Sequence, residues 1–585
     1  MSAEQLITQH INTWTSALQT RSTAGRGNNG KIDLYGIKKL RELILELAVR
    51  GKLVPQDPND EPASTLLKCN EQRKQELAKS GNMKTAANVN INVGDCYLDL
   101  PKNWSWIRLG NLAKFIDYRG KTPKKTEYGI RLITAKNIKK GYIDLNPEEF
   151  ITEKDYQLWM TRGFPKKGDL LFTTEAPLGN AAIIELNEKF ALAQRSICFQ
   201  WHIPEISPFM LIQLLARPFQ SQLKDKSTGM TATGIKAAKL KEIPVILPPV
   251  YEQHKIVLRV KELMSLCDQL EQQSLTSMEA HSQLVKTLLA TLTDSKNAEE
   301  LAENWARISQ HFDTLFTTEA SIDALKQTIL QLAVMGKLVP QDPNDEPASE
   351  LLKRIEQEKA QLMKEGKIKK QKPLPPVSDE EKPFGLPEGW EFIRLGDLTG
   401  KMGSGSTPRG GQSAYVTEGI PFLRSQNVWN EGLRLDDVVY IDKNTHSKMD
   451  GTKVFPGDIL LNITGASLGR TLIFPDHIIE ANVSQHVTII RLLLGELAPF
   501  VHLAIKSPLI QNLVWRRQVG MAIEGLSKKT LELFEFPVPP LLEQHRIVTK
   551  IDELFIICEQ IKSRLRSAQQ TQLHLADALT DAALS

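Results

Sequence analysis

The segment LAVRGKLVPQDPNDEPAS, from Leu47 to Ser64, occurs almost unchanged as LAVMGKLVPQDPNDEPAS, from Leu332 to Ser349. Seventeen of its 18 residues are the same, at an offset of 285 positions. Two blocks of this length do not agree by chance, and self-similarity at a fixed distance indicates an internal repeat. The chain is therefore predicted to contain two copies of one structural unit.

Two further pairs of segments extend the repeat in the same order. LPKNWSWIRLGNL, from Leu100 to Leu112, corresponds to LPEGWEFIRLGDL, from Leu386 to Leu398. LPPVYEQHKIV, from Leu247 to Val257, corresponds to VPPLLEQHRIV, from Val538 to Val548. Each copy is predicted to contain a helical segment, a globular head and a long helix.

The two heads, roughly residues 120–240 and 407–530, share only scattered apolar, glycine and proline positions. A short frame is common to both, as in GDLLFTTEAPLG (Gly168 to Gly179) and GDILLNITGASLG (Gly457 to Gly469). One frame with two divergent surfaces suggests two related readers with different targets. The alternative is simple sequence drift after duplication, but drift does not explain why the flanking segments remained nearly identical.

Short apolar runs in the heads carry β-branched and aromatic residues between turn signals, which predicts strands. One helix is expected at 207–224, and its counterpart at 498–517. The fold class predicted for the chain is α+β, with two mixed α/β heads separated by long helices.

The flank before each head reads as helix, loop, helix. Gly51 and Gly336 supply left-handed caps that end the first helix, and the prolines of the loop delay the second helix until about Ala63 and Ala348. The carboxylates of the loop VPQDPNDEPAS could form a ligand site. A tight turn or a contact with a partner is the preferred interpretation.

The flank after each head is predicted to be one long helix, the first from about 252 to 292. Its apolar residues follow the 4,3,4,3 spacing of a coiled-coil seam. The seam residues are Ile256, Val260, Leu263, Cys267 and Leu270 in the first copy and Ile547, Ile551, Leu554, Cys558, Ile561 and Leu565 in the second. The two cysteines therefore read as packing residues. His254 and His545 lack a second ligand one turn later and read as surface or capping residues.

Composition excludes several classes of protein. The 585 residues suffice for about three or four domains, and 41% hydrophobic with 24% charged residues is a globular balance. No apolar run is long enough for a transmembrane helix, and the N-terminal sequence does not resemble a secretory signal. Five scattered cysteines argue against a disulfide framework or zinc site and favour a reducing cytoplasm. The net charge of +4 is small, so any DNA-binding charge must be local.

Motifs for catalysis are incomplete. Phe115 stands where a P-loop ending at Thr122 needs its first glycine, and Pro408 replaces the third glycine of a dinucleotide fingerprint. FPDHIIEAN, from Phe474 to Asn482, lacks the lysine of a nuclease carboxylate cluster. There is no Asn-Pro-Pro-aromatic tetrapeptide of the kind that amino-methyltransferases use. The chain is therefore predicted not to be an enzyme.

Residues suited to DNA are concentrated in the heads. The stretch from Arg119 to Gly141 holds eight Lys or Arg and one acid, Glu127, which suits phosphate neutralisation. A solvated basic loop is the alternative. The second head offers more groups able to read bases, because Arg pairs with guanine and Asn or Gln with adenine. The DNA-binding candidates are Arg119, Lys121, Thr122, Lys124, Lys125, Lys136, Asn137, Arg195 and Lys236 in the first head and Ser406, Thr407, Arg409, Arg424, Gln426, Asn427, His486 and Lys528 in the second.

Heads opened by LPxxWxxxxLG and closed by PPxxEQHxIV before a long helix, with the repeated GKLVPQDPNDEPAS block, resemble the specificity subunit of type I restriction–modification enzymes. The resemblance implies that each head is a target recognition domain for one half of a split, asymmetric DNA sequence. It implies that the conserved helices pair as antiparallel coiled coils, space the heads and dock two methyltransferase subunits. It also places S-adenosylmethionine, ATP and Mg²⁺ on the methyltransferase and restriction subunits, with no cofactor, catalytic residue or metal in this chain.

The domains expected from the repeat are an N-terminal helical region (1–99), two recognition domains (100–250 and 386–541), a central helical region (251–385) and a C-terminal helix (542–585). Pairing of the chain ends would give a pseudo-two-fold object. The stretch from 21 to 31 has no counterpart in the second copy, which leaves the start of the first helical region open. A self-contained DNA methyltransferase or nuclease and a coiled-coil scaffold without a DNA role are the alternative functions.

Overall fold

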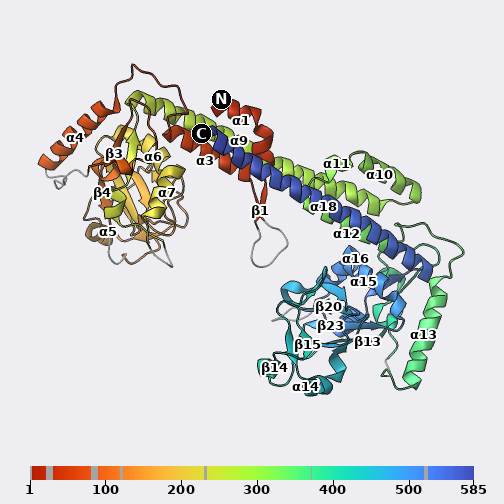
Figure 1. Cartoon of the computed structure of the whole chain (residues 1–585). Coiled ribbons are helices and arrows are strands. Elements are labelled where there is room, and N and C mark those ends of the chain that lie inside the picture. Colours follow the sequence, from red (N-terminus) through yellow and green to blue (C-terminus); the bar gives the residue numbers. More distant parts are fainter. Residues whose placement is uncertain are drawn as a thin grey trace. The chain divides into compact units, whose positions relative to one another are not determined.

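The computed structural model describes residues 3–21, 31–80, 90–118, 123–228, 233–369, 372–518 and 525–584. The chain forms two compact units, each with one head (Figure 1). The first comprises Met1–Arg21, Lys31–Thr276 and Gln569–Ser585, and the second comprises Ser277–Ala568. Each unit thus contains part of both long helices. No helix in the described ranges combines the length and apolar character that a membrane crossing requires.

The first unit is built from the following elements. Its helices are α1 (Ala3–Gln9), α2 (Ile11–Ser16), α3 (Tyr35–Val49), α4 (Ala63–Lys79), α5 (Glu153–Trp159), α6 (Ser207–Leu215), α7 (Arg217–Asp225), α8 (Ala237–Lys241) and the start of α9 (Val250–Asp294). Its strands are β1 (Gln19–Arg21), β2 (Lys31–Asp33), β3 (Ser105–Arg108), β4 (Ala113–Asp117), β5 (Ile130–Ile133), β6 (Phe150–Ile151), β7 (Leu170–Thr173), β8 (Ala181–Ile183), β9 (Phe190–Leu192), β10 (Ser196–Trp201) and β11 (Pro244–Leu247).

In the second unit two helices again precede the helix-loop-helix and the head. Its helices are α10 (Ala298–Gln310), α11 (Phe312–Leu315), α12 (Glu319–Val334), α13 (Ala348–Lys364), α14 (Lys443–Lys448), α15 (Ala498–Lys506), α16 (Pro508–Arg516), α17 (Lys528–Glu532) and most of α18 (Leu541–Leu584). Its strands are β12 (Glu391–Arg394), β13 (Thr399–Ser404), β14 (Tyr415–Val416), β15 (Ile420–Leu423), β16 (Val428–Trp429), β17 (Gly432–Leu433), β18 (Val439–Ile441), β19 (Lys453–Val454), β20 (Ile459–Asn462), β21 (Thr471–Ile473), β22 (Ala481–Val483), β23 (Val487–Leu492) and β24 (Glu535–Val538).

The two heads share their sheet topology. A four-stranded antiparallel sheet has the order β4-β10-β7-β8 in the first head and β13-β23-β20-β21 in the second. A second sheet contains one parallel pair, β5 with β9 or β15 with β22. The first and last strands of each head pair with each other, β3 with β11 and β12 with β24. Each head therefore closes on itself before the chain enters a long helix.

The central strand of each four-stranded sheet is buried on both faces. In β7, Leu170 and Phe172 belong to one hydrophobic cluster, while Leu171 belongs to another. In β20, Ile459 lies in one cluster and Leu460 in another. Successive strand side chains point to opposite faces, so the sheet separates two cores. The continuous apolar runs of these strands follow from this double burial.

The single helices expected at 207–224 and 498–517 are wrong, because each is two helices joined at a sharp break. Pro218 and Pro508 stand at the start of α7 and α16. Proline disfavours the helical conformation in the residue before it, and Ser507 is extended with ψ 153°. Gln511 bridges the break by donating to the carbonyls of Ile505 and Gly469, at 2.8 and 3.0 Å.

The helix-loop-helix prediction is confirmed in both copies. Gly51 and Gly336 adopt φ of +66° and +69° directly after α3 and α12. The next helices begin at Ala63 and Ala348, as expected. The preference for a turn is supported by Gln341 of the loop, whose amide donates to the Gly336 carbonyl at 2.7 Å.

Within each unit, the first helix of the repeat runs antiparallel to a long helix. In the first unit Arg41 of α3 binds Glu271 of α9, while Gln56 binds Glu252 near the start of α9. In the second unit Glu319 of α12 binds Arg566 of α18. Lys326 binds Glu559, and Gln341, in the loop after α12, binds Glu543 near the start of α18. The two helices are antiparallel, because the residue numbers rise along one partner while they fall along the other.

The predicted seam of α9 is confirmed, because its residues are 6% exposed or less. In α18 the residues Ile547, Ile551 and Cys558 are similarly buried, whereas Leu554, Ile561 and Leu565 are only partly buried against the same core. The end of α18 packs on the N-terminal helices, where Tyr35 donates to Asp577 at 2.8 Å and Gln569 donates to the Leu18 carbonyl at 2.9 Å. The chain ends therefore meet in the first unit, as the repeat predicted. Residues 22–30, from the segment without a counterpart, lie outside the described residues.

Candidate nucleic-acid interface

The parallel strands of each head end at the same edge of their sheet. In the first head the chain leaves β5 through a turn that carries Lys136, and it leaves β9 through a turn that carries Arg195. Two hydrogen bonds fasten these turns to their neighbours: Ala193 N donates to the Ile133 carbonyl at 2.8 Å, and Thr174 N donates to the Arg195 carbonyl at 2.9 Å. We call this region, together with Glu175 and Lys236, the common edge of the first head.

The second head fastens its edge through the same backbone pattern. Ser484 N donates to the Leu423 carbonyl at 2.9 Å, and Ile463 N donates to the His486 carbonyl at 3.0 Å. The common edge of the second head comprises Arg424, Gln426, Thr464, Gln485 and His486. Equal hydrogen bonds identify equivalent positions, so the side chains of the two edges can be compared one by one.

Asn137 and Asn427 are anchors of this frame. Asn137 is 1% exposed; its oxygen accepts from Thr134 N and Oγ1, and its amide donates to the carbonyls of Asp144 and Pro147. Asn427 is fully buried and binds the Arg424 amide in the same way, at 2.9 Å. Neither side chain is available to a base in this structure. The sequence-based assignment of both as DNA contacts is therefore replaced by a role in holding the turn.

The basic stretch of the first head is partly neutralised. Lys125, Arg131 and Lys139 form ion pairs with acidic neighbours. Among the described residues, we find no ion pair for the exposed Lys124, Lys136 and Lys140. Three predicted DNA contacts, Arg119, Lys121 and Thr122, lie outside the described residues.

Arg195 and Lys236 are both exposed at the common edge of the first head. Arg195 adopts φ +71°, an uncommon conformation for a residue other than glycine, and lies 3.6 Å from Glu175. Glu175 also pairs with the Gly234 backbone, two residues before Lys236. The edge thus brings Lys136, Arg195 and Lys236 into one neighbourhood, with one carboxylate among them.

Side chains of the second edge form hydrogen bonds within the head. Arg424 donates to the Asp437 carbonyl at 2.6 Å, and Gln426 donates to the Asp437 carboxylate. His486 Nδ1 lies 2.7 Å from Thr464 Oγ1. Sequence reasoning missed Asp437, which follows Asn427 by ten residues and reaches the turn only because the chain doubles back through β16 and β17.

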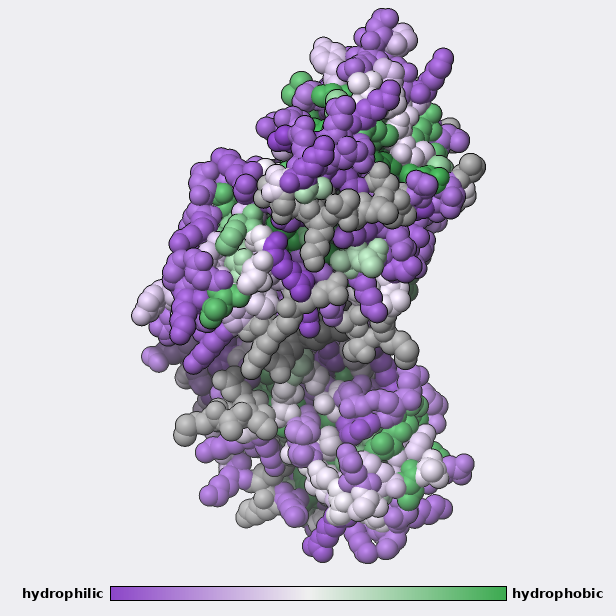
Figure 2. All heavy atoms as spheres, turned by 90° about the vertical axis from the view of Figure 1, so that its left-hand side faces the viewer, coloured by the Kyte–Doolittle hydropathy of each residue, from purple (hydrophilic) through white to green (hydrophobic). Residues whose placement is uncertain are grey.

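The other predicted residues of the second head lie on the loop after β13, where Ser406, Thr407 and Arg409 stand, and at the start of α17, where Lys528 stands. Thr407 donates to Gln485, and Ser406 N donates to the Val483 carbonyl at 3.1 Å. Arg409 is exposed on the loop after β13. Lys528 is also exposed and lies 3.3 Å from Glu532, one turn along α17. Hydrophilic residues predominate on the face drawn in Figure 2, and hydrophobic residues form small separate patches there.

Sequence reasoning also missed an arginine–tryptophan stack next to this edge. The guanidinium carbons of Arg434 and Arg470 lie 3.5 and 3.7 Å from the centre of the Trp429 ring. Such contacts stabilise a cation over a ring face. Gly432, between Trp429 and Arg434, is a turn signal that could have indicated the hairpin of β16 and β17.

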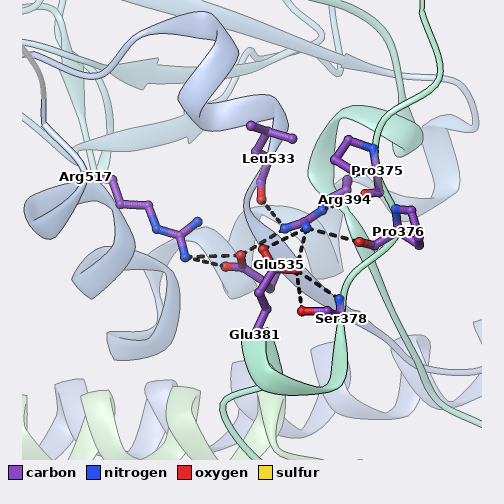
Figure 3. A network of polar contacts seen from close by, with 8 residues as sticks. All are labelled: Pro375, Pro376, Ser378, Glu381, Arg394, Arg517, Leu533 and Glu535. Carbon is purple, nitrogen blue, oxygen red and sulfur yellow. Dashed lines mark hydrogen bonds and ion pairs between the residues drawn. The ribbon is translucent and has the colours of Figure 1, made fainter.

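A buried polar network fixes the base of the second head (Figure 3). Arg394 of β12 donates to Glu535 of β24 at 2.9 Å and to Glu381 at 2.7 Å, and Arg517 at the end of α16 lies 2.9 Å from the other oxygen of Glu535. The Arg394 hydrogen bond lowers the pKa of Glu381 to about 2. The network joins the head to the strand pair that closes it.

A matched anchor joins each head to its long helix. Trp104 donates to Glu252 at 2.8 Å, and Trp390 donates to Glu543 at 3.0 Å. Burial raises the pKa of both carboxyl groups. These residues are the tryptophan of LPxxW and the glutamate of PPxxE. The motifs that identify the repeat therefore also join each head to its long helix.

The described residues contain no group of three or more His, Cys, Asp or Glu side chains arranged to hold a metal ion. Glu480, within the segment that imitates a nuclease cluster, lies 2.9 Å from the buried His446. Nδ1 of that histidine also accepts from the Asn482 amide at 2.9 Å. This arrangement reads as a packing network between α14 and β22.

Comparison with known proteins places these features in one family. A family model described as "Type I restriction modification DNA specificity domain" matches residues 101–280 and again residues 387–568. The two matches begin at the paired first strands and extend into the long helices. The chain belongs to this family.

Two relatives from Escherichia coli match these specificity domains and the helices around them over the full length of both proteins. The type I restriction enzyme EcoAI specificity subunit is 45% identical to this chain and the EcoEI specificity subunit is 44% identical, each with 100% of both chains covered. A solved chain from a study of complex assembly in a type I restriction–modification system covers 83% of this chain and 98% of its own length, with 18% identity and a TM-score of 0.46.

Proposed function

We propose that this chain supplies DNA sequence specificity to a type I restriction–modification complex, and that each specificity domain reads one half of a split target. The observation that carries the proposal is the double match of the family model to two heads with one frame and different edges. Two readers on a duplicated frame suit a target with two unlike halves.

The two heads differ in the exposed side chains of their common edges, where contacts to bases are proposed. By their backbone hydrogen bonds, Lys136 of the first head corresponds to Gln426 of the second, and Arg195 corresponds to His486. Glu175 likewise corresponds to Thr464, because Glu175 pairs with Gly234 and Thr464 pairs with the equivalent Gly525. The buried anchors Asn137 and Asn427 are the same residue type. Contacts to base edges must differ between different targets, whereas the scaffold that presents them need not.

The long helices and the repeated turn are proposed to serve the partners. In this proposal two methyltransferase subunits dock on the conserved helices and supply S-adenosylmethionine chemistry, and restriction subunits supply ATP- and Mg²⁺-dependent steps. The chain itself contributes no catalytic group, cofactor or metal. Acting on cellular DNA with these partners would place it in the cytoplasm.

Methylation mapping tests this function directly. The chain is expressed with its methyltransferase subunits in a host without other adenine methylation, and modified adenines are mapped. We expect one bipartite motif; after replacement of residues 399–534 by the corresponding segment of a relative, one half of the motif should change and the other should remain. Methylation without a sequence motif, or two unchanged halves after the exchange, would contradict the proposal. Methylation by the purified chain alone would instead favour a self-contained enzyme.

A further inference from the structure

Trp429 is held between two arginine side chains in the second specificity domain. The guanidinium carbons of Arg434 and Arg470 lie 3.5 and 3.7 Å from the ring centre. At these distances both groups lie almost directly over the ring, and two groups cannot share one face without overlapping. The ring is therefore sandwiched, with one guanidinium on each face.

The sandwich concentrates positive charge that Glu431 offsets only in part. Across the described part of the chain, we find no ion pair or side-chain hydrogen bond for either Arg434 or Arg470. Lys506 adds a third cation and donates to the Asn430 carbonyl at 3.3 Å. Burial lowers the pKa of Arg470, Glu431 opposes that shift, and Arg434 adds to it. Guanidinium groups offer five donors each, and here these donors remain for solvent or a ligand.

The stack is fixed to the common edge by several hydrogen bonds. Trp429 Nε1 donates to the carbonyl of Gln426 at 2.6 Å. The buried amide of Asn462 donates to the carbonyls of Ser425 and Val428, on either side of the anchor Asn427. The hairpin that carries Trp429 thus begins where the turn with Arg424 and Gln426 ends.

The first specificity domain has different chemistry at the equivalent positions. Asp144 N donates to the Asn137 carbonyl at 2.8 Å and Arg434 N donates to the Asn427 carbonyl at 2.9 Å, so Asp144 and Arg434 correspond. The position of Trp429 is taken by Lys139, which lies 3.8 Å from Asp144. A stacked arginine in one copy is therefore replaced by an ion pair in the other.

The difference between Arg434 with Trp429 in one copy and Asp144 with Lys139 in the other favours a contact to a base over a contact to a phosphate. Phosphate contacts carry no sequence information, so a duplicated frame has no reason to change them in this way. A stacked guanidinium is planar and pre-oriented, and its fork of donors matches the O6 and N7 acceptors of guanine. Arg434 is exposed, whereas Arg470 is partly buried beneath the ring.

We infer that Arg434, held against Trp429 and backed by Arg470, reads a guanine in the half-site of the second specificity domain. The inference rests on the proposed function and names one of its specificity-determining contacts. Trp429 and Arg470 are positioning residues, because they act on DNA through the orientation of Arg434.

The test uses the full chain with its methyltransferase subunits. Methylation maps are compared for wild type, Arg434→Ala, Arg434→Lys and the control Arg307→Ala, which removes an exposed positive charge from α10. Binding of each assembled complex to its own motif and to variants with one guanine replaced is measured in the same buffer. The Arg434→Lys protein keeps the charge and loses the planar fork, so its effect separates geometry from charge.

We expect both Arg434 variants to accept other bases at one guanine of one half-site, with discrimination there reduced about 5- to 150-fold. The other half-site and the control should remain unchanged. An unaltered motif in both variants overturns the inference, as does uniform weakening on all sequences with a smaller salt slope, which is the result for a phosphate contact. Failure of the proposed function gives a different result, since wild type then shows no motif.

Discussion

Arg394 Nη1 donates to Glu535 Oε1 at 2.9 Å, and the two side chains are only 4% and 3% exposed. This pair joins β12 and β24, the strands that open and close the second specificity domain. In the first domain the facing position holds Pro244 opposite Arg108, so the carboxylate is replaced by a residue with no charge. The two copies close their heads with different chemistry on the same strand pair.

Replacement of Arg394 by Ala should therefore destabilise the second unit strongly. Glu535 would lose its most buried partner and keep only the half-exposed Arg517, which lies 2.9 Å from its other oxygen. A buried charge left wholly without compensation typically costs about 3–5 kcal/mol, so with Arg517 still in place we expect a loss of about 2–3 kcal/mol. Urea unfolding followed by hydrogen exchange in β12 and β24 measures the change. Lys382→Ala removes an exposed pair with Asp379 and should cost less than about 1 kcal/mol. Equal effects of the two substitutions would contradict the assigned role of Arg394.

The Arg394–Glu381 contact should make this region sensitive to acid. The pKa of Glu381 is lowered to about 2, chiefly by the hydrogen bond from Arg394. A carboxyl group with a depressed pKa in the folded state stabilises the fold above its unfolded pKa, and this contribution is lost as the pH falls through the folded value. The stability difference between wild type and Glu381→Gln should therefore be constant near neutrality and shrink between about pH 4.5 and pH 2. A difference that does not change over that range would contradict this account.

The two tryptophan anchors should respond alike to the same substitution. Trp104→Phe and Trp390→Phe each remove one hydrogen bond to a buried glutamate, Glu252 or Glu543, while keeping most of the apolar contact. Each should cost on the order of 1–2 kcal/mol, because the carboxylate loses a donor in a desolvated site. Thermal unfolding of the two variants gives the comparison. A much smaller effect in one copy would show that its head is fastened to the helix by other contacts.

Much of the frame could be predicted from the sequence because periodicity and repeats report on it directly. The glycine caps and the α9 seam follow from local rules. The breaks in the helices at Pro218 and Pro508 could not be predicted in this way. Whether a proline breaks a helix here depends on tertiary contacts, such as the hydrogen bonds that Gln511 donates across the break. Apolar periodicity alone continued the helix through the proline.

The candidate site was harder to predict, since residue type does not show which way a side chain points. The amides of Asn137 and Asn427 could pair with adenine, but both are buried and form hydrogen bonds within their own turns. Trp429, Arg434 and Arg470 are separated by up to 41 positions, and only pairing of β16 with β17 and packing on β21 unite them. Such contacts are a property of the tertiary structure and leave no signal in spacing.

Substitutions of the buried Asn137 and of the exposed Lys136, which lie in the same turn, should separate effects on stability from effects on DNA recognition. Asn137→Ala removes four hydrogen bonds and leaves buried backbone groups without partners, which should cost on the order of 2–3 kcal/mol and increase hydrogen exchange in the turn after β5. Lys136→Ala, one residue earlier, removes an exposed side chain and should leave stability within about 0.5 kcal/mol. If Lys136 faces DNA, the same variant should weaken binding by the assembled complex or relax the first half-site, while the second half-site is kept. Unchanged binding and an unchanged motif in Lys136→Ala would remove this residue from the interface, even if the anchor behaves as expected.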